Sequence, residues 1–329
     1  MILRFGLLLF ALLFCAFAPP ANAVDYPTRH ITLVVPFPAG SGPDVYARII
    51  ADKLTPRLGQ PVVIENRAGG GGTTGGRAVA NAEPDGYMLL FGSTSSVVVA
   101  PAVAREAPYD PVTAFTPIIQ VARGPFILSV RSDLPINNLA ELIDYAKRNP
   151  GKLNYGTSGP GSLHHLSTEM LKRATGIDMV HIPFPGGAQS WTALQSGVVD
   201  VIFDSMPGPI SALQSGKARA IAVTGAKHLA DLPGVVGLAK VATFDEQGVK
   251  GVDVIFWFGI LAPAATPAPI IAKLYTTLAA VLSDPDVQAK FGQQSIESAP
   301  DTVGDFGQLI AQQARHWQQV VKDTGAKQE

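Results

Sequence analysis

Four short segments of the sequence combine glycine with hydroxyl or aromatic side chains, and each follows a short apolar run. Backbone N–H groups at the start of a helix are unpaired and together carry about half a positive charge, and glycine lets a ligand approach them closely. Serine and threonine add neutral donors, so such segments could hold a carboxylate without an arginine. The residues that we expect at this site are Phe37, Pro38, Ala39, Gly40, Ser41 and Asp44 in the first segment, Ser93, Thr94 and Ser95 in the second, Thr157, Ser158 and Ser162 in the third, and Phe184, Gly187 and Ala188 in the fourth, together with Asp204.

The elements that must position these segments alternate between strands and helices along the chain. Such alternation predicts an α/β fold with parallel sheets covered by helices, and a ligand crevice outside the carboxyl ends of the strands. Because the four segments follow predicted strands, we expect them to share one cleft. Strands are predicted at 31–35, 62–64, 88–91, 153–155, 179–182, 199–203, 220–223 and 254–261, and helices at 44–58, 139–146, 162–175 and over most of 268–324.

A purely structural role is the simpler alternative for any one segment. Asp44 and Ser162 stand where helix caps or first-turn residues are expected, and glycines serve turns. Asp204, at the end of a predicted strand, could bind a ligand or order a turn. The recurrence of one composition in both halves of the chain nevertheless favours a shared ligand site.

A serine hydrolase is the competing functional hypothesis, because several residues near these segments could supply a nucleophile, a base and an acid. The sequence has no G-x-S-x-G elbow around any of its candidate serines. Adjacent residues of a helix diverge by about 100°, so at most one of the two neighbouring histidines faces a cleft. The residues that such an enzyme would use are Ser158, Ser162, His164, His165, Asp204 and Ser205.

Cofactor and metal sites have little support in the sequence. Residues 70–75 satisfy G-x-G-x-x-G after a predicted strand, as a dinucleotide site requires. The next strand, however, ends in Gly92-Ser93 rather than in an acidic residue, so we interpret the glycines as a tight turn. His181 and His228 stand alone, without partners at metal-ligand spacing. No cofactor and no metal are therefore expected.

The first residues of the chain predict export to the periplasm. Met1–Ala23 combines Arg4, a short apolar run and the small-residue site Ala21-Asn22-Ala23, the pattern of a signal peptide cleaved after Ala23. Acylation of Cys15 is a minor alternative, which the bulky residue before it disfavours.

The remaining chain is expected to form two domains, because a single core is improbable at this length. Without Arg4 the chain has 24 Lys and Arg against 26 Asp and Glu, with no run of positive charge. This balance argues against a nucleic-acid partner. The sequence offers no second apolar stretch of membrane length, and nothing in it indicates an obligate assembly, so a monomer is expected.

Short motifs follow one another from residue 26 to the C-terminal part of the chain in a specific order. They are Tyr26-Pro27 with Val34-Val35-Pro36-Phe37-Pro38-Ala39-Gly40 and Asp44, Glu65-Asn66-Arg67-Ala68-Gly69, Pro84-Asp85-Gly86-Tyr87, Tyr109-Asp110-Pro111 with Phe115-Thr116-Pro117-Ile118, Asn149-Pro150-Gly151-Lys152, Tyr155-Gly156-Thr157-Ser158-Gly159-Pro160-Gly161-Ser162 with His165-Leu166, His181-Ile182-Pro183-Phe184 with Gly186-Gly187-Ala188, and Trp257-Phe258-Gly259 with Leu261-Ala262-Pro263 and Thr266-Pro267. This ordered combination resembles the substrate-binding receptors of tripartite tricarboxylate transporters, often called Bug proteins.

The resemblance implies a type II periplasmic-binding-protein fold, with two α/β lobes and a ligand cleft between them. It places lobe 1 at residues 24–123 and 227–329 and lobe 2 at residues 124–226. The first segment and Gly156–Ser162 would supply the main ligand contacts, partly through backbone and waters, with Phe37 and Phe184 lining the apolar part. The implied partners are a small organic carboxylate and the membrane permease subunits of the transporter.

The implied function is capture of the solute without chemistry, and two alternatives stay open. One is a periplasmic adaptor that senses a ligand for a signalling partner, and the other is the serine hydrolase. Two departures from the family pattern bear on ligand identity. Ser41 stands where a second glycine is usual, and residues 232–251 lack the usual Pro-Thr segment and read Gly234-Val235-Val236-Gly237-Leu238.

Overall fold

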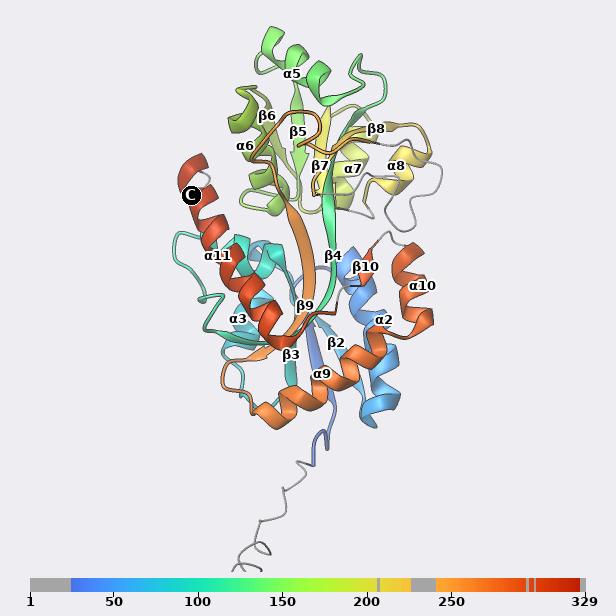
Figure 1. Cartoon of the computed structure of the whole chain (residues 1–329), viewed down its shortest axis with the longest axis vertical. Coiled ribbons are helices and arrows are strands. Elements are labelled where there is room, and N and C mark those ends of the chain that lie inside the picture. The colour runs from blue at the N-terminus through green and yellow to red at the C-terminus, as the bar shows by residue number, and fades with distance from the viewer. Residues whose placement is uncertain (1–24, 206–207, 226–240, 294–295, 299, 326–329) are drawn as a thin grey trace, which may run out of the picture.

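The computed structural model describes residues 25–205, 208–225, 241–293, 296–298 and 300–325, which form two stacked α/β lobes (Figure 1). The predicted signal peptide and the atypical segment Gly234–Leu238 lie outside the described residues. None of the described helices is long and apolar enough to cross a membrane. The predicted α/β class with two lobes is confirmed.

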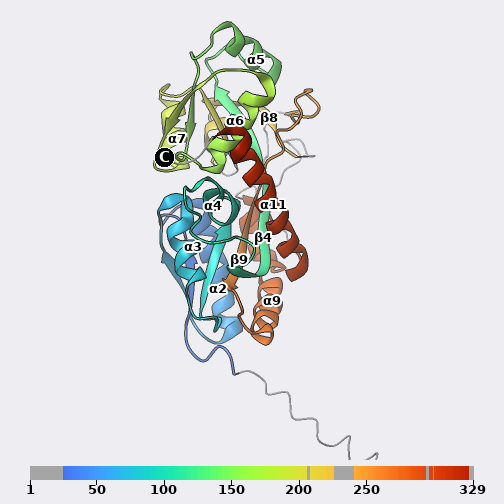
Figure 2. The same ribbon diagram turned by 90° about the vertical axis from the view of Figure 1, so that its left-hand side faces the viewer.

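The first lobe is built on a sheet in the order β2-β1-β3-β9-β4. Figure 2 shows α3 and α4 on one side of this sheet and α9 and α11 on the other. Its elements are β1 (Ile31–Val35), α2 (Gly42–Leu58), β2 (Val62–Asn66), the short helix η1 (Gly70–Gly72), α3 (Thr73–Ala80), β3 (Met88–Ser93), the π-helical segment η2 (Thr94–Val99), α4 (Ala100–Val103), β9 (Ile255–Pro263), α9 (Ala268–Leu282), α10 (Pro285–Gln293), β10 (Glu297–Ser298) and α11 (Val303–Thr324).

The second lobe continues the same sheet in the order β4-β7-β5-β6, with β8 also paired to β4. Its large apolar side chains are buried on both faces, as expected for strands covered by helices. Its elements are α5 (Leu139–Arg148), β5 (Asn154–Thr157), α6 (Leu163–Thr175), β6 (Val180–Pro183), α7 (Gly187–Gln195), β7 (Val201–Ser205), α8 (Ile210–Gln214) and β8 (Ala218–Val223).

A single long strand, β4 (Phe115–Arg131), belongs to both lobes. Its residues Phe115 to Pro125 pair with β9, whereas Phe126 to Arg131 pair with β7 and β8. The chain therefore passes from one lobe to the other between Pro125 and Phe126. Thr224 secures this point, because its hydroxyl accepts from the Phe126 N–H at 2.7 Å and donates to the Val254 carbonyl.

The predicted lobe boundaries can be compared with these contacts. The first was set between residues 123 and 124, close to the change of pairing in β4, and the second lies outside the described residues. Residues 243–249 hydrogen-bond to the second lobe, through Phe244 N–H to Val223 and through Gln247 to Ile221 and Leu139. These contacts tie residues 243–249 to the second lobe, and the predicted lobe boundaries stay a prediction.

The helices that follow the strands begin and end where their sequence predicts. In α2, Tyr46, Ile50, Leu54 and Leu58 recur at every fourth position and are all buried, which is the apolar stripe that fixes a helix on a sheet. The helix ends at Gly59, whose φ of 70° is accessible to glycine without steric strain. Helix α6 likewise starts after its cap Ser162 and ends at Gly176.

The C-terminal helix α11 extends along both lobes (Figure 2). It packs on β4, η2 and α4 of the first lobe and on α6 of the second. Near its end, the Arg173 guanidinium of α6 donates to the backbone carbonyl of Asp323. The lobes are therefore connected by β4, by β9 and by this helix.

Candidate functional site

The directions of the strands bring all of the predicted loops to the junction between the lobes. Strands β1, β2 and β3 are parallel to one another, β3 is antiparallel to β9, and β9 is antiparallel to β4. Strands β1, β2 and β3 are therefore parallel to β4 and run toward the second lobe. Strand β7 is antiparallel to β4, and β5 and β6 are parallel to β7, so these strands run toward the first lobe. The carboxyl ends of both sets, where ligands of α/β proteins bind, face each other.

The first loop, residues 36–42, is held in shape by the buried side chain of Asp44 at the start of α2. Its Oδ2 accepts from the Gly40 N–H at 2.8 Å and from Arg48 Nε at 3.0 Å, and its Oδ1 accepts from Asn66 Nδ2 at 2.9 Å. Burial raises the pKa of Asp44, but the hydrogen bonds from Arg48, Gly40 and Asn66 outweigh it and lower the pKa overall. Asp44 is therefore a fixed anion that orders the loop.

The other predicted residues of the first loop lie at its surface. Pro38, Ala39 and Gly40 are exposed, whereas Phe37 is half-buried against the core. The Ser41 hydroxyl, which replaces the expected glycine, donates to the Pro38 carbonyl at 2.7 Å. The loop thus presents backbone and small side chains at the junction.

The second loop, residues 92–95, opens into a helix, which the sequence did not make clear. Ser93 and Ser96 cap the π-helical segment η2 reciprocally, each side chain bonding the other's N–H. Thr94 is fully buried, and its Oγ1 accepts from the Trp257 N–H of β9 at 2.8 Å. Ser95 is the predicted residue of this loop that is left half-exposed.

The third loop, residues 156–162, satisfies most of its own polar groups. The buried Thr157 Oγ1 lies 2.7 Å from His181 Nε2 and accepts from the Gly159 N–H. Ser162 is the cap of α6, and its hydroxyl accepts from the His165 N–H and donates to the Gly159 carbonyl. At the first turn of α6, the N–H groups of Leu163 and His164 have no carbonyl partner within the helix.

Ser158 belongs to a hydrogen-bonded chain that runs from the third loop to the end of β7. Its Oγ lies 2.7 Å from His164 Nδ1, and His164 Nε2 lies 2.5 Å from Asp204 Oδ1. Asp204 also accepts from Trp191 Nε1 at 2.8 Å and from the Ser205 N–H at 2.6 Å. Burial raises the pKa of Asp204, but His164 and the other donors outweigh it and lower the pKa overall.

The fourth loop, residues 184–188, lies beside this chain. A Cβ added to Gly187 would stand 3.4 Å from Asp204 Oδ2, so this loop packs closely on the buried carboxylate. Phe184 packs half-buried in the second lobe with its ring against Gly156, and Ala188 is exposed. The third and fourth loops and Asp204 therefore form one cluster.

Tyr46 of α2 connects this cluster with the first lobe. Its ring lies against Gly42 and is packed by Phe258 and Phe291. The hydroxyl is buried and has no hydrogen-bond partner among the described residues. Burial, and secondly the charge of Asp204 across the junction, raise the pKa of Tyr46. The Tyr46 hydroxyl has no partner among the described residues, and the charge of Asp204 in the other lobe affects its pKa. It therefore marks the place where the two sets of loops meet.

Two further histidines contact the third loop. The rings of His165 and His181 are stacked with their centroids 4.2 Å apart, and His165 Nδ1 accepts from the Gly161 N–H. Burial lowers the pKa of His165 and of His181. For His181, burial and secondly the neighbouring His165 lower the pKa to about 4. Both rings are therefore neutral near pH 7, and they support the loop.

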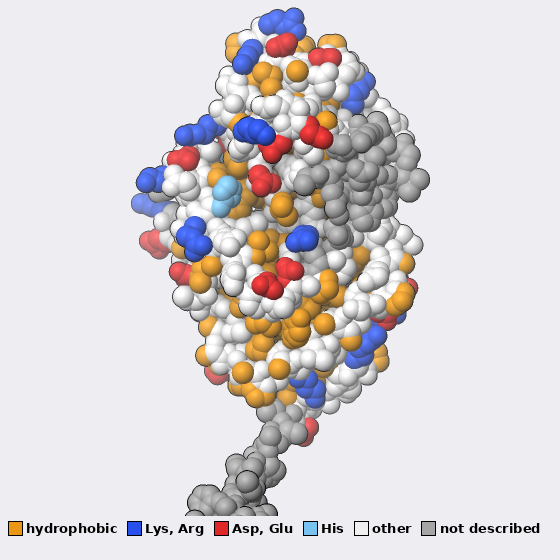
Figure 3. Space-filling view, viewed as in Figure 1, with side chains coloured by type: hydrophobic (Ala, Val, Ile, Leu, Met, Phe, Trp, Pro, Cys, Tyr) orange, Lys and Arg blue, Asp and Glu red, His pale blue; other side chains and the backbone are white. Residues whose placement is uncertain are grey.

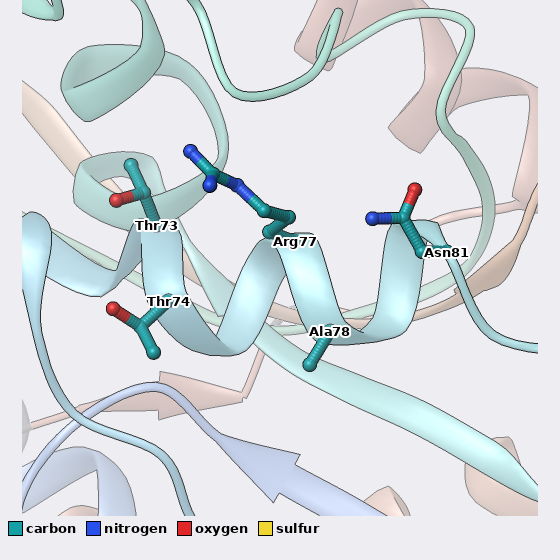
Figure 4. A pocket seen from close by; sticks show the side chains of 5 residues that line it. All are labelled: Thr73, Thr74, Arg77, Ala78 and Asn81. Atoms are coloured by element: carbon teal, nitrogen blue, oxygen red, sulfur yellow. The ribbon is translucent and has the colours of Figure 1, made fainter.

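A separate surface pocket lies outside these loops. It follows α3 and is lined by Thr73, Thr74, Arg77, Ala78 and Asn81 (Figure 4). The glycines that precede α3 serve close packing, because a Cβ on Gly72 would stand 2.5 Å from Ser96 Cβ and one on Gly75 would stand 2.9 Å from Pro36 Cβ. The tight-turn interpretation of residues 70–75 agrees with this contact.

The described residues carry a mixture of charges on the face that Figure 3 shows. Figure 3 shows positive and negative side chains interspersed over the viewed face, with neither sign dominant. Among the residues that the structure describes, no cluster of three His, Cys, Asp or Glu side chains could hold a metal ion.

The comparison with known proteins settles the family. The model of the tripartite tricarboxylate transporter family receptor matches residues 46–326. This chain belongs to that family. Its relative BugT of Bordetella pertussis is 33% identical over 314 residues, which cover 94% of each chain. The predicted resemblance is thereby confirmed, and the receptors of this family are periplasmic solute-binding proteins.

Two solved structures of Rhodopseudomonas palustris proteins share the fold of this receptor. Rpa4515 with adipate is 37% identical and has a TM-score of 0.83, covering 92% of this chain and 99% of its own. MatC with bound malate is 32% identical and has a TM-score of 0.81, covering 90% of this chain and 100% of its own.

Sequence reasoning missed three side chains of the receptor's junction, namely Tyr46, His164 and Trp191. His164 was weighed only as one of two adjacent histidines, and the helical rotation of about 100° between them did not say which one faces Asp204. Trp191 is buried in the core, as a tryptophan usually is, but its indole N–H donates to Asp204. Tyr46 could have been found from the sequence, because it lies one helical turn after the glycine-rich first loop and so close to the predicted site.

Proposed function

We propose that this protein is a periplasmic receptor that captures a small carboxylate between its lobes and delivers it to the permease subunits of a tripartite tricarboxylate transporter. Closure of the lobes would be stabilised by donors from both sides that reach the anion together. The signal peptide would be removed after Ala23, and the mature protein would act as a monomer. The captured molecule leaves unchanged, so the protein is a receptor and not an enzyme.

One observation carries this proposal. The carboxyl ends of β1 and β3 face those of β5, β6 and β7, so that neutral donors of two rigid lobes converge on one junction. Many of the predicted hydroxyls are already engaged within their loops, and Ser95 and Ser158 are left half-exposed, one in each lobe. We therefore assign direct ligand contact first to these two hydroxyls, to Tyr46 and to the first-turn N–H groups of α6. The engaged residues Thr157 and Ser162 hold the third loop in its binding shape.

A small carboxylate is the ligand class that fits these groups. Hydroxyl and N–H donors stabilise an anion, and the bound adipate and malate of the two related proteins are dicarboxylates. The fixed charges nearby are negative, since Asp44 and Asp204 are both ionised, but each already accepts hydrogen bonds from its own donors. The first-turn amides therefore meet the ligand without a competing free charge.

The experiment is a thermal-shift screen of the mature protein against carboxylates, including adipate, malate and amino acids, because a ligand that binds only the folded state raises the melting temperature. For the best ligand, Ser158→Ala and Ser95→Ala should each weaken binding by about 1–2 kcal/mol, the loss for a hydrogen bond to a charged group. Ser132→Ala, remote from the junction, is the matched control. A screen without any hit, or unchanged affinity in both variants, would remove the proposed site.

The hydrogen-bonded order Ser158–His164–Asp204 also favours a second candidate, a serine hydrolase. The loop amides that follow Ser158 do not supply an oxyanion hole, which needs free donors. The N–H of Gly159 is bonded to Thr157 and that of Gly161 to His165, and residue 160 is a proline. Hydrolysis of a p-nitrophenyl ester that disappears in Ser158→Ala would support the enzyme. We expect no turnover.

A further inference from the structure

The hydrogen-bonded chain Ser158–His164–Asp204 fixes where the protons of its imidazole lie. Asp204 is ionised and only accepts hydrogen bonds, so His164 Nε2, 2.5 Å from its Oδ1, must carry a proton in either charge state. The proton that His164 can gain or lose is therefore the one on Nδ1, which lies 2.7 Å from Ser158 Oγ. The charge state of His164 thus decides which partner donates in that contact.

With a neutral His164, Nδ1 is a bare acceptor, and the hydroxyl proton of Ser158 has to lie in the bond to it. Ser158 Oγ then has only lone pairs to offer in other directions, and a carboxylate, which also only accepts, gains nothing from it. With a cationic His164, the Nδ1–H donates to Ser158 Oγ instead. The hydroxyl proton is then free to turn toward the junction and to donate to a carboxylate.

We propose that the receptor binds its carboxylate together with one proton, which is taken up on His164 Nδ1 and converts Ser158 from an acceptor into a donor toward the ligand. This inference rests on the proposed function. His164 is thus a positioning residue that acts through Ser158. The step balances, because solvent supplies one proton, no covalent bond changes, and the bound anion is compensated by the new imidazolium.

The surroundings of His164 give this proton no competing site. Asp204, from the end of β7, is the charged group in contact with the ring among the described residues. The ring also faces Phe126 of β4 at 5.5 Å, and Trp191 of α7 bonds the far oxygen of Asp204. Tyr46 of α2, across the junction, is neutral because its pKa is raised. On α6 itself, Glu169 and Lys172 interact with His165 and His181.

The chemical class of the ligand follows from the gain of one proton on binding. A site that gains one positive charge as it binds is matched to a ligand that presents an ionised carboxylate to Ser158. A neutral amide of the same shape can instead donate to Ser158 through its NH₂ group and needs no proton. The receptor should therefore discriminate an acid from its amide more strongly as the pH falls.

The test is titration calorimetry of the mature protein with adipate or malate, or with the best acid of the screen that is fully ionised at neutral pH. Heats measured near pH 7.5 in phosphate and in Tris, whose ionisation enthalpies differ, give the number of protons taken up per ligand. We expect net proton uptake on binding in the wild type. By linkage, the Kd should rise toward tenfold per pH unit where that proton has to be acquired.

His164→Gln keeps a donor for Asp204 but cannot titrate, so it should bind without proton uptake and with a flat pH profile. His30→Gln, at an exposed histidine before β1, is the matched control and should behave like the wild type. Should His164→Gln fail to fold, Ser158→Ala serves instead, since it leaves the ring but removes the hydroxyl that the proton reorients. Its proton uptake should fall below half of the wild-type value.

The outcomes separate the two proposals. If no carboxylate binds, the proposed function fails and this inference fails with it. If a carboxylate binds without proton uptake, or with an uptake that His164→Gln leaves intact, the receptor stands and the role of His164 is refuted. Turnover of the ligand during the titration would refute both in favour of the hydrolase.

Discussion

The two lobes present similar loops to their junction, but among the described residues only the second lobe places imidazoles against those loops. In the first lobe, Asp44 is fixed by Arg48, Asn66 and the Gly40 N–H, and the remaining polar groups are hydroxyls and amides. In the second lobe, three imidazoles surround the third loop, and one of them contacts Asp204. The first lobe is thus a fixed frame, whereas the second can respond to protons.

The largest difference is expected when the carboxylate of each lobe is removed. Asp204→Ala leaves a buried indole N–H and the imidazole without their acceptor and should lower the free energy of unfolding by about 3 kcal/mol. Asp44→Ala breaks contacts of which one partner, Arg48, is half-exposed, and should lower it by only about 1–2 kcal/mol. Urea unfolding of both variants measures this. Equal losses would contradict the contrast between the lobes.

The second prediction concerns pH. The pKa of His181 is lowered to about 4 in the folded protein, so the unfolded chain binds the proton more tightly. The stabilisation by the neutral ring is complete above about pH 6.5, the ordinary value for histidine, and is lost as the pH falls from there toward 4. After allowance for the partial exposure of the ring, the loss is on the order of 2 kcal/mol.

This pH effect is measured by urea unfolding of the wild type and His181→Gln at about pH 7.5 and pH 5. The variant should lose less stability than the wild type between the two values, whereas His30→Gln should follow the wild type. Hydrogen exchange should place the acid-induced opening in the third loop and α6. Opening that begins in the first and second loops would instead locate the sensitivity in the first lobe.

The smallest effect is expected at Ser41, the departure from the family pattern. Its exposed hydroxyl bonds only the Pro38 carbonyl of its own loop, so Ser41→Gly should change the unfolding free energy by less than about 0.5 kcal/mol and the affinity by less than about twofold. Urea unfolding measures the stability of the wild type and of Ser41→Gly, and titration calorimetry with the same acid measures their affinities. A tenfold loss of affinity would make Ser41 a direct donor to the ligand and give the first lobe a larger share of recognition.

Much of the fold could be predicted because its signals are local. The strand at 31–35 is found with its predicted bounds, and the helices that start near Asp44 and Ser162 are confirmed. The strand was indicated by an uninterrupted apolar run, and the helices by apolar residues at every fourth position and by a glycine at the end. The long strand β4 was not predicted as one element. Pro117, Gly124 and Pro125 interrupt its pattern, and prolines are ordinarily confined to strand edges and bulges.

The site could be predicted only as a set of loops. Strand alternation implies that such loops gather at one place, but the partner of each side chain is set by tertiary contacts. Thr94 finds its donor 163 residues away and His164 finds Asp204 40 residues away. For this reason the sequence could name hydroxyls that lie in the right loops, but it could not separate Ser158, which is half-exposed, from Thr157, which is turned inward.

The continuity of β4 has a mechanical consequence. No flexible linker separates the lobes along this strand, and its hydrogen-bond ladder changes partners only around Gly124 and Pro125, where the proline has no N–H to contribute. We expect a rotation of one lobe against the other to twist β4 near that point, together with β9 and α11, which also connect the lobes. Such a continuous connection should favour one angle between the lobes over a freely variable one.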